Sequence, residues 1–168
     1  MNQKTIPSTG DITLKPTLAY WIINNTFSII FIIAVIVLND IFTNYEILRY
    51  VFLILSLGII VRTFYNYIDT LICTSWVITD EQITIHKGVF SKSKSYIELY
   101  RVTDYEENKS FIQALTNNTN VTIISGDKST PELRITGIKE GTNIVNKIRQ
   151  RVELQKQIKG IFEATNKF

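Results

Sequence analysis

The sequence predicts a membrane α plus all-β fold, in which a two-helix transmembrane hairpin is followed by a small antiparallel β-barrel and a C-terminal helix that covers it. Two apolar stretches, residues 19–38 and 47–68, each have about the 20 residues that a helix needs to cross a hydrocarbon core. From residue 75 onward apolar residues recur at every second position, as in strands with one buried face. Near the end an apolar residue recurs every four positions, which predicts an amphipathic helix.

These changes of pattern divide the chain into three parts. Residues 1–18 are interpreted as a loose N-terminal tail, although residues 11–15 could pair with the edge of a sheet. Residues 19–70 form the predicted transmembrane hairpin, and residues 71–168 form the β-barrel with its helix. A cleaved signal peptide is not expected, because the first apolar stretch is long and ends in Asn39-Asp40 without small residues at a cleavage site.

Polar residues interrupt both predicted spans. Asn24 and Asn25 lie near the start of the first, and Arg62 lies about two turns before the end of the second. Amides in a spanning helix can hydrogen-bond to a neighbouring helix, so these three residues are candidate contacts between protomers. Arg62 can also extend its guanidinium to the membrane surface. We expect it to form an interfacial collar with nearby aromatic residues, namely Tyr20, Trp21, Tyr65 and Tyr67.

The distribution of basic residues predicts an orientation in the membrane. Lys4 and Lys15 precede the first span, whereas residues 39–46 between the spans contain no Lys or Arg. Because basic segments stay on the cytoplasmic side, both termini are predicted to be cytoplasmic. The single cysteine, Cys73, cannot form an intramolecular disulfide, which is consistent with a reducing compartment.

The second half of the chain contains a series of short predicted strands. The alternation in residues 82–86 places Ile83 and Ile85 on one face, and Ile97 and Leu99 point inward from a later strand. Residues 111–115 are too short for a full helix and are interpreted as a bend that fills the core. Further strands are expected at residues 76–79, 91–99, 101–105, 120–124 and 132–136, and the final helix carries the stripe Ile144, Ile148 and Val152.

Charge and composition argue against several classes of function. The net charge is +3, and residues 69–168 carry 14 basic and 12 acidic side chains, so the concentrated basic face of a nucleic-acid binder is missing. One histidine and one cysteine do not make a conventional zinc site. The sequence contains no nucleophile elbow and no phosphate-binding loop. We therefore expect no enzyme activity, no cofactor and no metal.

Several motifs resemble the bacterial membrane-flanked pleckstrin-homology-like (PH-like) domain family. Residues 76–90 match its opening strand pair, and residues 97–105 occupy the place of its "I-P-L-x-x-I-x-x-V" strand, although Glu98 replaces the usual proline. Residues 109–112 and 135–138 resemble its later bend and its closing glycine strand. The resemblance implies a seven-stranded PH-like barrel capped by a helix, in a bacterial inner (cytoplasmic) membrane protein, and it implies no catalytic residues.

PH-like barrels often bind phosphorylated head groups through basic residues near their early strand loops. Here the candidates flank the second and third strands of the predicted barrel. The first functional hypothesis is a non-enzymatic membrane module that presents the barrel to a partner membrane protein or to anionic lipid and associates with other copies. Its candidate ligand-binding residues are His86, Lys87, Lys92, Lys94 and Arg101.

The order of two helices and a β-barrel also resembles certain bacterial antiphage effectors, in which the barrel binds a cyclic nucleotide and the helices oligomerise. Arg101 could then pair with phosphate, and tyrosines could stack on the bases. The residues to test for this alternative are Tyr96, Tyr100, Arg101 and Tyr105. A third hypothesis is a subunit of a larger transporter or envelope complex with no sensing role.

Overall fold

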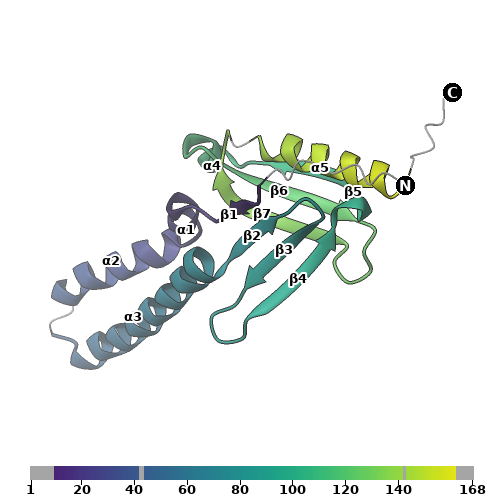
Figure 1. Ribbon diagram of the computed structural model, residues 1–168. Coiled ribbons are helices and arrows are strands. Elements are labelled where there is room, and N and C mark those ends of the chain that lie inside the picture. The colour runs from purple at the N-terminus through teal and green to yellow at the C-terminus, as the bar shows by residue number, and fades with distance from the viewer. Residues whose placement is uncertain (1–9, 42–43, 142, 162–168) are drawn as a thin grey trace.

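A helical hairpin projects from one end of a β domain in the computed structural model, which describes residues 10–41, 44–141 and 143–161 (Figure 1). The hairpin helices pack against each other, and the second continues into a π-helical turn at Ile68–Cys73 before the sheets begin. The helices of this projecting part are α1 (Leu18–Asn24), α2 (Thr26–Ile41) and α3 (Glu46–Tyr67).

The first apolar stretch is not the continuous helix that its composition predicts. It breaks at Asn25, and the two pieces are bent by 64°. Asn25 ends α1, and its side-chain amide donates to the Trp21 carbonyl at 2.8 Å, which holds the break in place. Among the described residues one helix, Glu46–Cys73, is long and apolar enough to cross a membrane, and α1 with α2 qualifies only as a bent pair.

The short helix α1 is attached to the β domain. The Thr17 amide donates to the Gly137 carbonyl at 2.9 Å, and the Thr17 hydroxyl donates to the Asn118 side chain at 2.7 Å. Gly137 has a φ of +66°, and a Cβ there would lie 2.1 Å from the Tyr20 ring. Glycine at this position therefore lets α1 lie directly on the sheet.

The strands form two open antiparallel sheets, one in the order β1-β2-β3-β4 and one in the order β5-β6-β7. Among the described residues these sheets share no strand pairing, so they do not close into the predicted β-barrel. The chain leaves the first sheet through a 3₁₀ turn at Leu99–Arg101, so β5 begins the second sheet instead of extending the first. The strands are β1 (Ile12–Leu14), β2 (Ser75–Ile78), β3 (Gln82–Lys87), β4 (Ser93–Glu98), β5 (Val102–Asn108), β6 (Asn118–Ser125) and β7 (Glu132–Lys139).

Residues 11–15 do pair with a sheet edge, as their pattern allowed. Strand β1 runs antiparallel to β2, with Ile12 opposite Ile78 and Leu14 opposite Trp76. The segment that precedes the helices thus belongs to the same sheet as the segment that follows them. Both ends of the hairpin are therefore tied to the first sheet.

The core lies between the sheets and α5 (Ile144–Ile158), and it confirms the predicted periodicities. The four residues expected to point inward from the early strands are buried, and so are the three members of the helical stripe. Arg151 of α5 is also buried, and its guanidinium donates to the carbonyls of Ile78 at 2.7 Å and Gly10 at 2.8 Å. The buried apolar residues at predicted positions are Ile83, Ile85, Ile97, Leu99, Ile144, Ile148 and Val152.

The prediction that residues 111–115 fill the core is wrong. They form a one-turn helix, α4 (Phe111–Leu115), which begins with a capping box between Ser110 and Gln113. The capping side chain of Gln113 faces inward and is the buried one of this turn. The apolar side chains of the turn therefore point outward. Phe111, Ile112 and Leu115 are all exposed.

Candidate functional site

The β3–β4 hairpin carries most of the predicted basic residues. Lys87 ends β3, Lys92 lies in the connecting loop, and Lys94 lies on β4 opposite His86. The loop turns at Gly88, where φ is +100° and a Cβ would lie 2.0 Å from the Ser91 carbonyl oxygen. A side chain does not fit in this turn, so the sequence Lys87-Gly88 ends the strand as its pattern predicts.

The tip of this hairpin reaches back to the transmembrane candidate helix. The Phe90 ring stacks on the Tyr65 ring of α3, with centroids 6.0 Å apart and an interplanar angle of 15°. Phe90 is nevertheless 90% exposed. Trp21 of α1 meets Tyr67 edge to face at 5.4 Å, so part of the predicted aromatic collar does come together. Because Tyr65 and Tyr67 are two residues apart, the hairpin tip and this collar contact the same turn of α3, on different faces.

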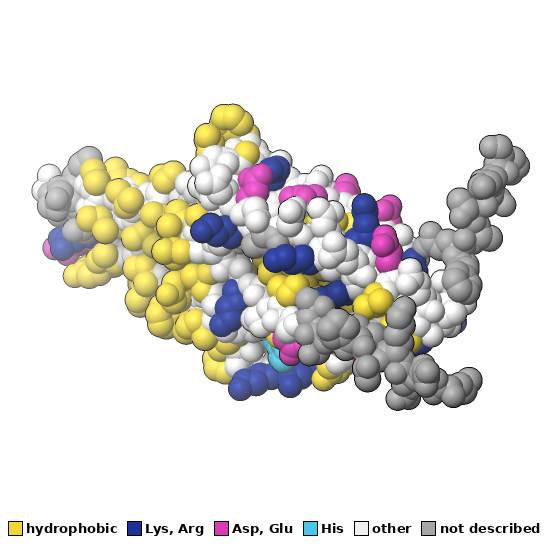
Figure 2. All heavy atoms as spheres, turned by 45° about the horizontal axis from the view of Figure 1, so that its top comes forward, with side chains coloured by type: hydrophobic (Ala, Val, Ile, Leu, Met, Phe, Trp, Pro, Cys, Tyr) yellow, Lys and Arg dark blue, Asp and Glu magenta, His cyan; other side chains and the backbone are white. Residues whose placement is uncertain are grey.

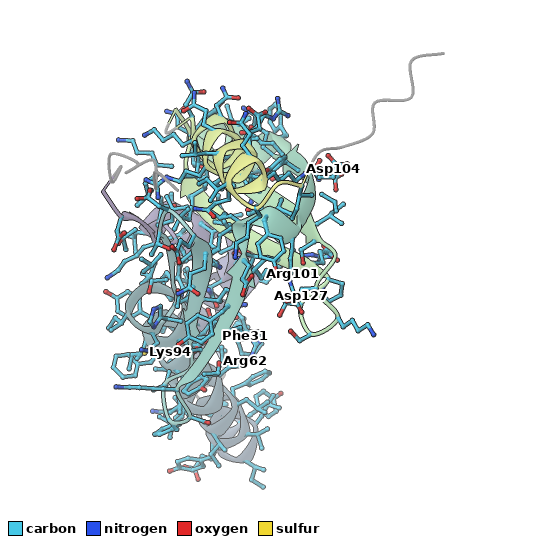
Figure 3. The ribbon with its side chains drawn as sticks, turned by 45° about the vertical axis from the view of Figure 1, so that its right-hand side comes forward. Phe31, Arg62, Lys94, Arg101, Asp104 and Asp127 are labelled. Atoms are coloured by element: carbon cyan, nitrogen blue, oxygen red, sulfur yellow. The ribbon has the colours of Figure 1, made fainter. Side chains whose placement is uncertain are left out.

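Arg101 lies apart from the lysines, at the opposite end of β4 (Figure 3). Its guanidinium pairs with Asp127 at 3.2 Å and donates to the Tyr100 hydroxyl at 3.1 Å. The hydrogen bond with Tyr100 raises the pKa of Arg101, and Asp127 adds to this effect. Hydrogen bonds from Ser129 lower the pKa of Asp127. This exposed ion pair bridges the β4–β5 and β6–β7 connections, and it leaves Arg101 already paired with a carboxylate.

The three tyrosines that were candidates for stacking on a nucleotide lie at separate places. Tyr96 is exposed on β4. Tyr100 lies under two cationic groups, the Arg101 guanidinium at 5.6 Å and the Lys159 ammonium at 4.9 Å from the ring centroid. Tyr105 lies on β5 beneath the guanidinium of an α5 arginine. The arrangement does not gather them around one ligand-sized space.

A second group of predicted residues does come together. Asn24, Asn25, Arg62 and Lys87 line one cavity of about 320 Å³ between the helices and the sheets. Asn25 also donates to the side-chain oxygen of Asn66 at 3.2 Å, so part of its hydrogen bonding is satisfied within the chain. Contact of these polar residues with another protomer stays a prediction.

Sequence reasoning missed several residues of this cavity, among them Asn66 and Trp76. A signal existed for Asn66, because it follows Arg62 by four residues and such pairs share one face of a helix. Trp76 was predicted only as the first residue of a strand; it is buried, and it also lines the cavity. Nothing in the local sequence predicts that Lys87 lies beside the helices, because that proximity depends on how the hairpin packs.

The surface changes character along the molecule (Figure 2). Hydrophobic side chains cover the projecting helices, whereas charged side chains gather on the β domain and near its border with the helices. Within the described ranges, no three His, Cys, Asp or Glu side chains lie close enough to hold a metal ion.

Comparison with known proteins gives one finding. A family model described as a bacterial PH domain matches residues 17–152, a range that includes the helices as well as most of the β domain. No curated protein and no solved structure matched the chain.

Proposed function

Because this chain belongs to the bacterial PH-domain family, we propose that it is a non-enzymatic, membrane-anchored module whose PH-like domain binds anionic lipid at the bilayer surface. PH domains are generally binding modules without catalytic residues. The observation that carries the proposal is the stack of Phe90 on Tyr65, because it places the basic hairpin beside the helix that would enter the membrane.

The helices support insertion in lipid. Only 11% of the most apolar window of Glu46–Cys73 is buried, and Ile47 and Ile54 are 83% and 71% exposed. A soluble monomer rarely exposes so long an apolar surface. A bilayer core of about 30 Å corresponds to roughly 20 residues at 1.5 Å each, so a core that begins near Ile47 ends near Asn66. Helix α2 begins near Asn66, to which Asn25 donates, and runs away from this surface to the start of α3, while the bent α1 lies at the interface.

This placement puts the tip of the β3–β4 hairpin at the lipid head groups. Tyr65 lies at the end of the proposed span, and Phe90 beside it is free to enter the interface, where aromatic rings are favoured. Lys87, Lys92 and Lys94 surround it on an exposed hairpin. Each lysine near an anionic surface adds about 1 kcal/mol of attraction. An apolar residue among several lysines is suited to a negatively charged bilayer.

The same placement supports the predicted orientation. The hairpin lysines and Arg62 then lie on the same side of the membrane as Lys15. The connection between the spans contains no basic residue, so the positive-inside rule makes the side of the β domain cytoplasmic. Both termini are then cytoplasmic, in an inner-membrane protein that crosses the bilayer twice.

The proposal is tested by the depth of the hairpin tip in a bilayer. The full chain, with Cys73→Ala and Phe90→Cys, is labelled with a fluorophore and placed in nanodiscs that contain phosphatidylglycerol and doxyl-labelled lipid. We expect strong quenching at this position. The matched control is Lys128→Cys, which places the same probe on the β6–β7 loop.

Two results would overturn the proposal. One is quenching at Phe90→Cys that is no stronger than at Lys128→Cys, since the tip would then not reach the lipid. The other is a chain that leaves the membrane fraction under alkaline carbonate, since it would then not be anchored. Replacing phosphatidylglycerol with phosphatidylcholine is expected to weaken the quenching, and Lys92→Gln with Lys94→Gln should remove that dependence on lipid charge.

A further inference from the structure

The cavity between the helices and the sheets has walls from both parts of the molecule. Helices α1 and α3 contribute Asn24, Arg62 and Asn66, and the sheets contribute Trp76 and Lys87. Its volume of about 320 Å³ is that of a small polar group with room for water. It lies at the same level of α3 as the Tyr65–Phe90 stack, since its lining residues Arg62 and Asn66 stand on either side of Tyr65 in the helix, and this is the level proposed for the membrane surface.

The lining is rich in hydrogen-bond donors and carries excess positive charge. Arg62 and Lys87 are both cationic, and neither has an ion pair within 4.0 Å among the described residues. Asp69 is the one acidic residue in the lining, so one of the two positive charges has no local counterpart. Amide groups of Asn24 and Asn66 add neutral donors. Such a set of side chains favours an anionic ligand that accepts several hydrogen bonds.

Trp76 leaves one buried hydrogen-bond donor unsatisfied beside this cavity. Its side chain is 1% exposed and lines this cavity, yet its indole Nε1–H has no hydrogen-bond partner in the part of the chain that the structure describes. An indole N–H is only a donor, and a buried donor without an acceptor is destabilising. The nitrogen itself is out of contact with solvent, so a ligand oxygen in the cavity reaches it only if the wall at Trp76 shifts on binding.

We infer that this cavity binds the phosphate group of one phospholipid molecule. Phosphate oxygens accept hydrogen bonds from guanidinium, ammonium and amide donors at once. The apolar surface of α3, including Val61 and Phe64, is exposed beside Arg62 and offers a path for the acyl chains. The assignment to a lipid rests on the proposed membrane anchoring, whereas the assignment to phosphate rests on the cavity itself.

The test measures binding of single lipids to the full chain in detergent by native mass spectrometry, with phosphatidylglycerol as the lipid and glycerol 3-phosphate as the soluble probe. We expect phosphatidylglycerol to bind in a 1:1 complex. Arg62→Gln and Lys87→Gln should each weaken it about tenfold, the effect of losing one hydrogen bond from a charged donor. Trp76→Phe should weaken it severalfold, and the control Lys128→Gln on a distant loop should leave it unchanged.

The outcomes separate this inference from the proposed function. Binding that is unchanged in both Arg62→Gln and Lys87→Gln overturns the phosphate site, even if the Phe90 probe is quenched by lipid. Glycerol 3-phosphate that binds as tightly as the lipid, with the same sensitivity to the variants, overturns the assignment to a phospholipid. Because Arg62 and Lys87 are exposed, their substitution should not impair folding, so the test does not depend on the Trp76→Phe variant.

Discussion

Gly137→Ala should detach α1 from the second sheet. Gly137 has a φ of +66°, a conformation that costs an L-residue about 1–2 kcal/mol. The added Cβ would lie 2.1 Å from Cγ and 2.6 Å from Cβ of Tyr20. These are the inner atoms of the side chain, so the whole residue must retreat by about 1.5 Å to reach ordinary carbon–carbon contact. Overpacking of this kind costs about 1–3 kcal/mol, so the total destabilisation is roughly 2–5 kcal/mol.

Gly141→Ala is the matched control. Gly141 also has a positive φ, +86°, but a Cβ there meets nothing within 4 Å, so only the backbone cost of about 1–2 kcal/mol applies. The measurement is the melting temperature of the full chain in detergent, followed by tryptophan fluorescence. The melting temperature of Gly137→Ala should be lower than that of Gly141→Ala by about 2–12 °C. This is the cost of the clash alone, because 1 kcal/mol corresponds to about 2–4 °C in a chain of this size.

A double-mutant cycle then identifies the cause. In a Tyr20→Ala background the extra loss in Gly137→Ala should largely disappear, because the ring that it meets is gone. The reasoning is refuted if Gly137→Ala and Gly141→Ala lower the melting temperature equally. It is also refuted if the extra loss persists unchanged without the Tyr20 ring, since the cost would then not come from the contact between α1 and β7.

Two further predictions concern polar groups of the β domain. Arg151→Met should lower the free energy of unfolding by about 2–4 kcal/mol, because two carbonyls lose their charged donor. The control is Lys147→Met at an exposed position, which should leave the free energy of unfolding nearly unchanged. Urea unfolding measures both. Hydrogen bonds from Ser129 lower the pKa of Asp127, so its stabilising effect is complete above about pH 4 and is lost as the pH falls through the lower folded value. Asp127→Asn should therefore flatten the acid side of the stability profile, and an unchanged profile would contradict this.

The periodic part of the fold could be predicted from the sequence because burial alone fixes it. Ile83 and Ile85 alternate with polar residues, so one face of the strand must be buried whatever it packs against. The same holds for the stripe of Ile144 and Ile148 on the last helix. Sheet closure is different, because it depends on whether two distant strand edges meet. The 3₁₀ turn at Leu99–Arg101 decides that point, and no periodicity reports it.

The candidate site divides in the same way. Basic residues of one hairpin, such as Lys87 and Lys94, are close because the register of a hairpin is local. Arg101 was grouped with them because it is near in sequence, but the strand carries it to the opposite end of β4. Conversely, Arg62 and Lys87 line one cavity although a helix end, a π-helical turn and two strands separate them.

Asn25 explains why the first apolar stretch departs from the expected straight helix. A single asparagine lowers the average hydropathy of a long apolar stretch only slightly, so hydropathy alone still predicts one continuous span. Its side-chain amide, however, has two specific acceptors, the Trp21 carbonyl that closes α1 and the Asn66 oxygen on α3. The bend that these bonds hold directs α1 onto β7, where Tyr20 rests on Gly137. The residue that interrupts the span therefore also helps to set how the helices hold the β domain, and it lines the cavity at that junction.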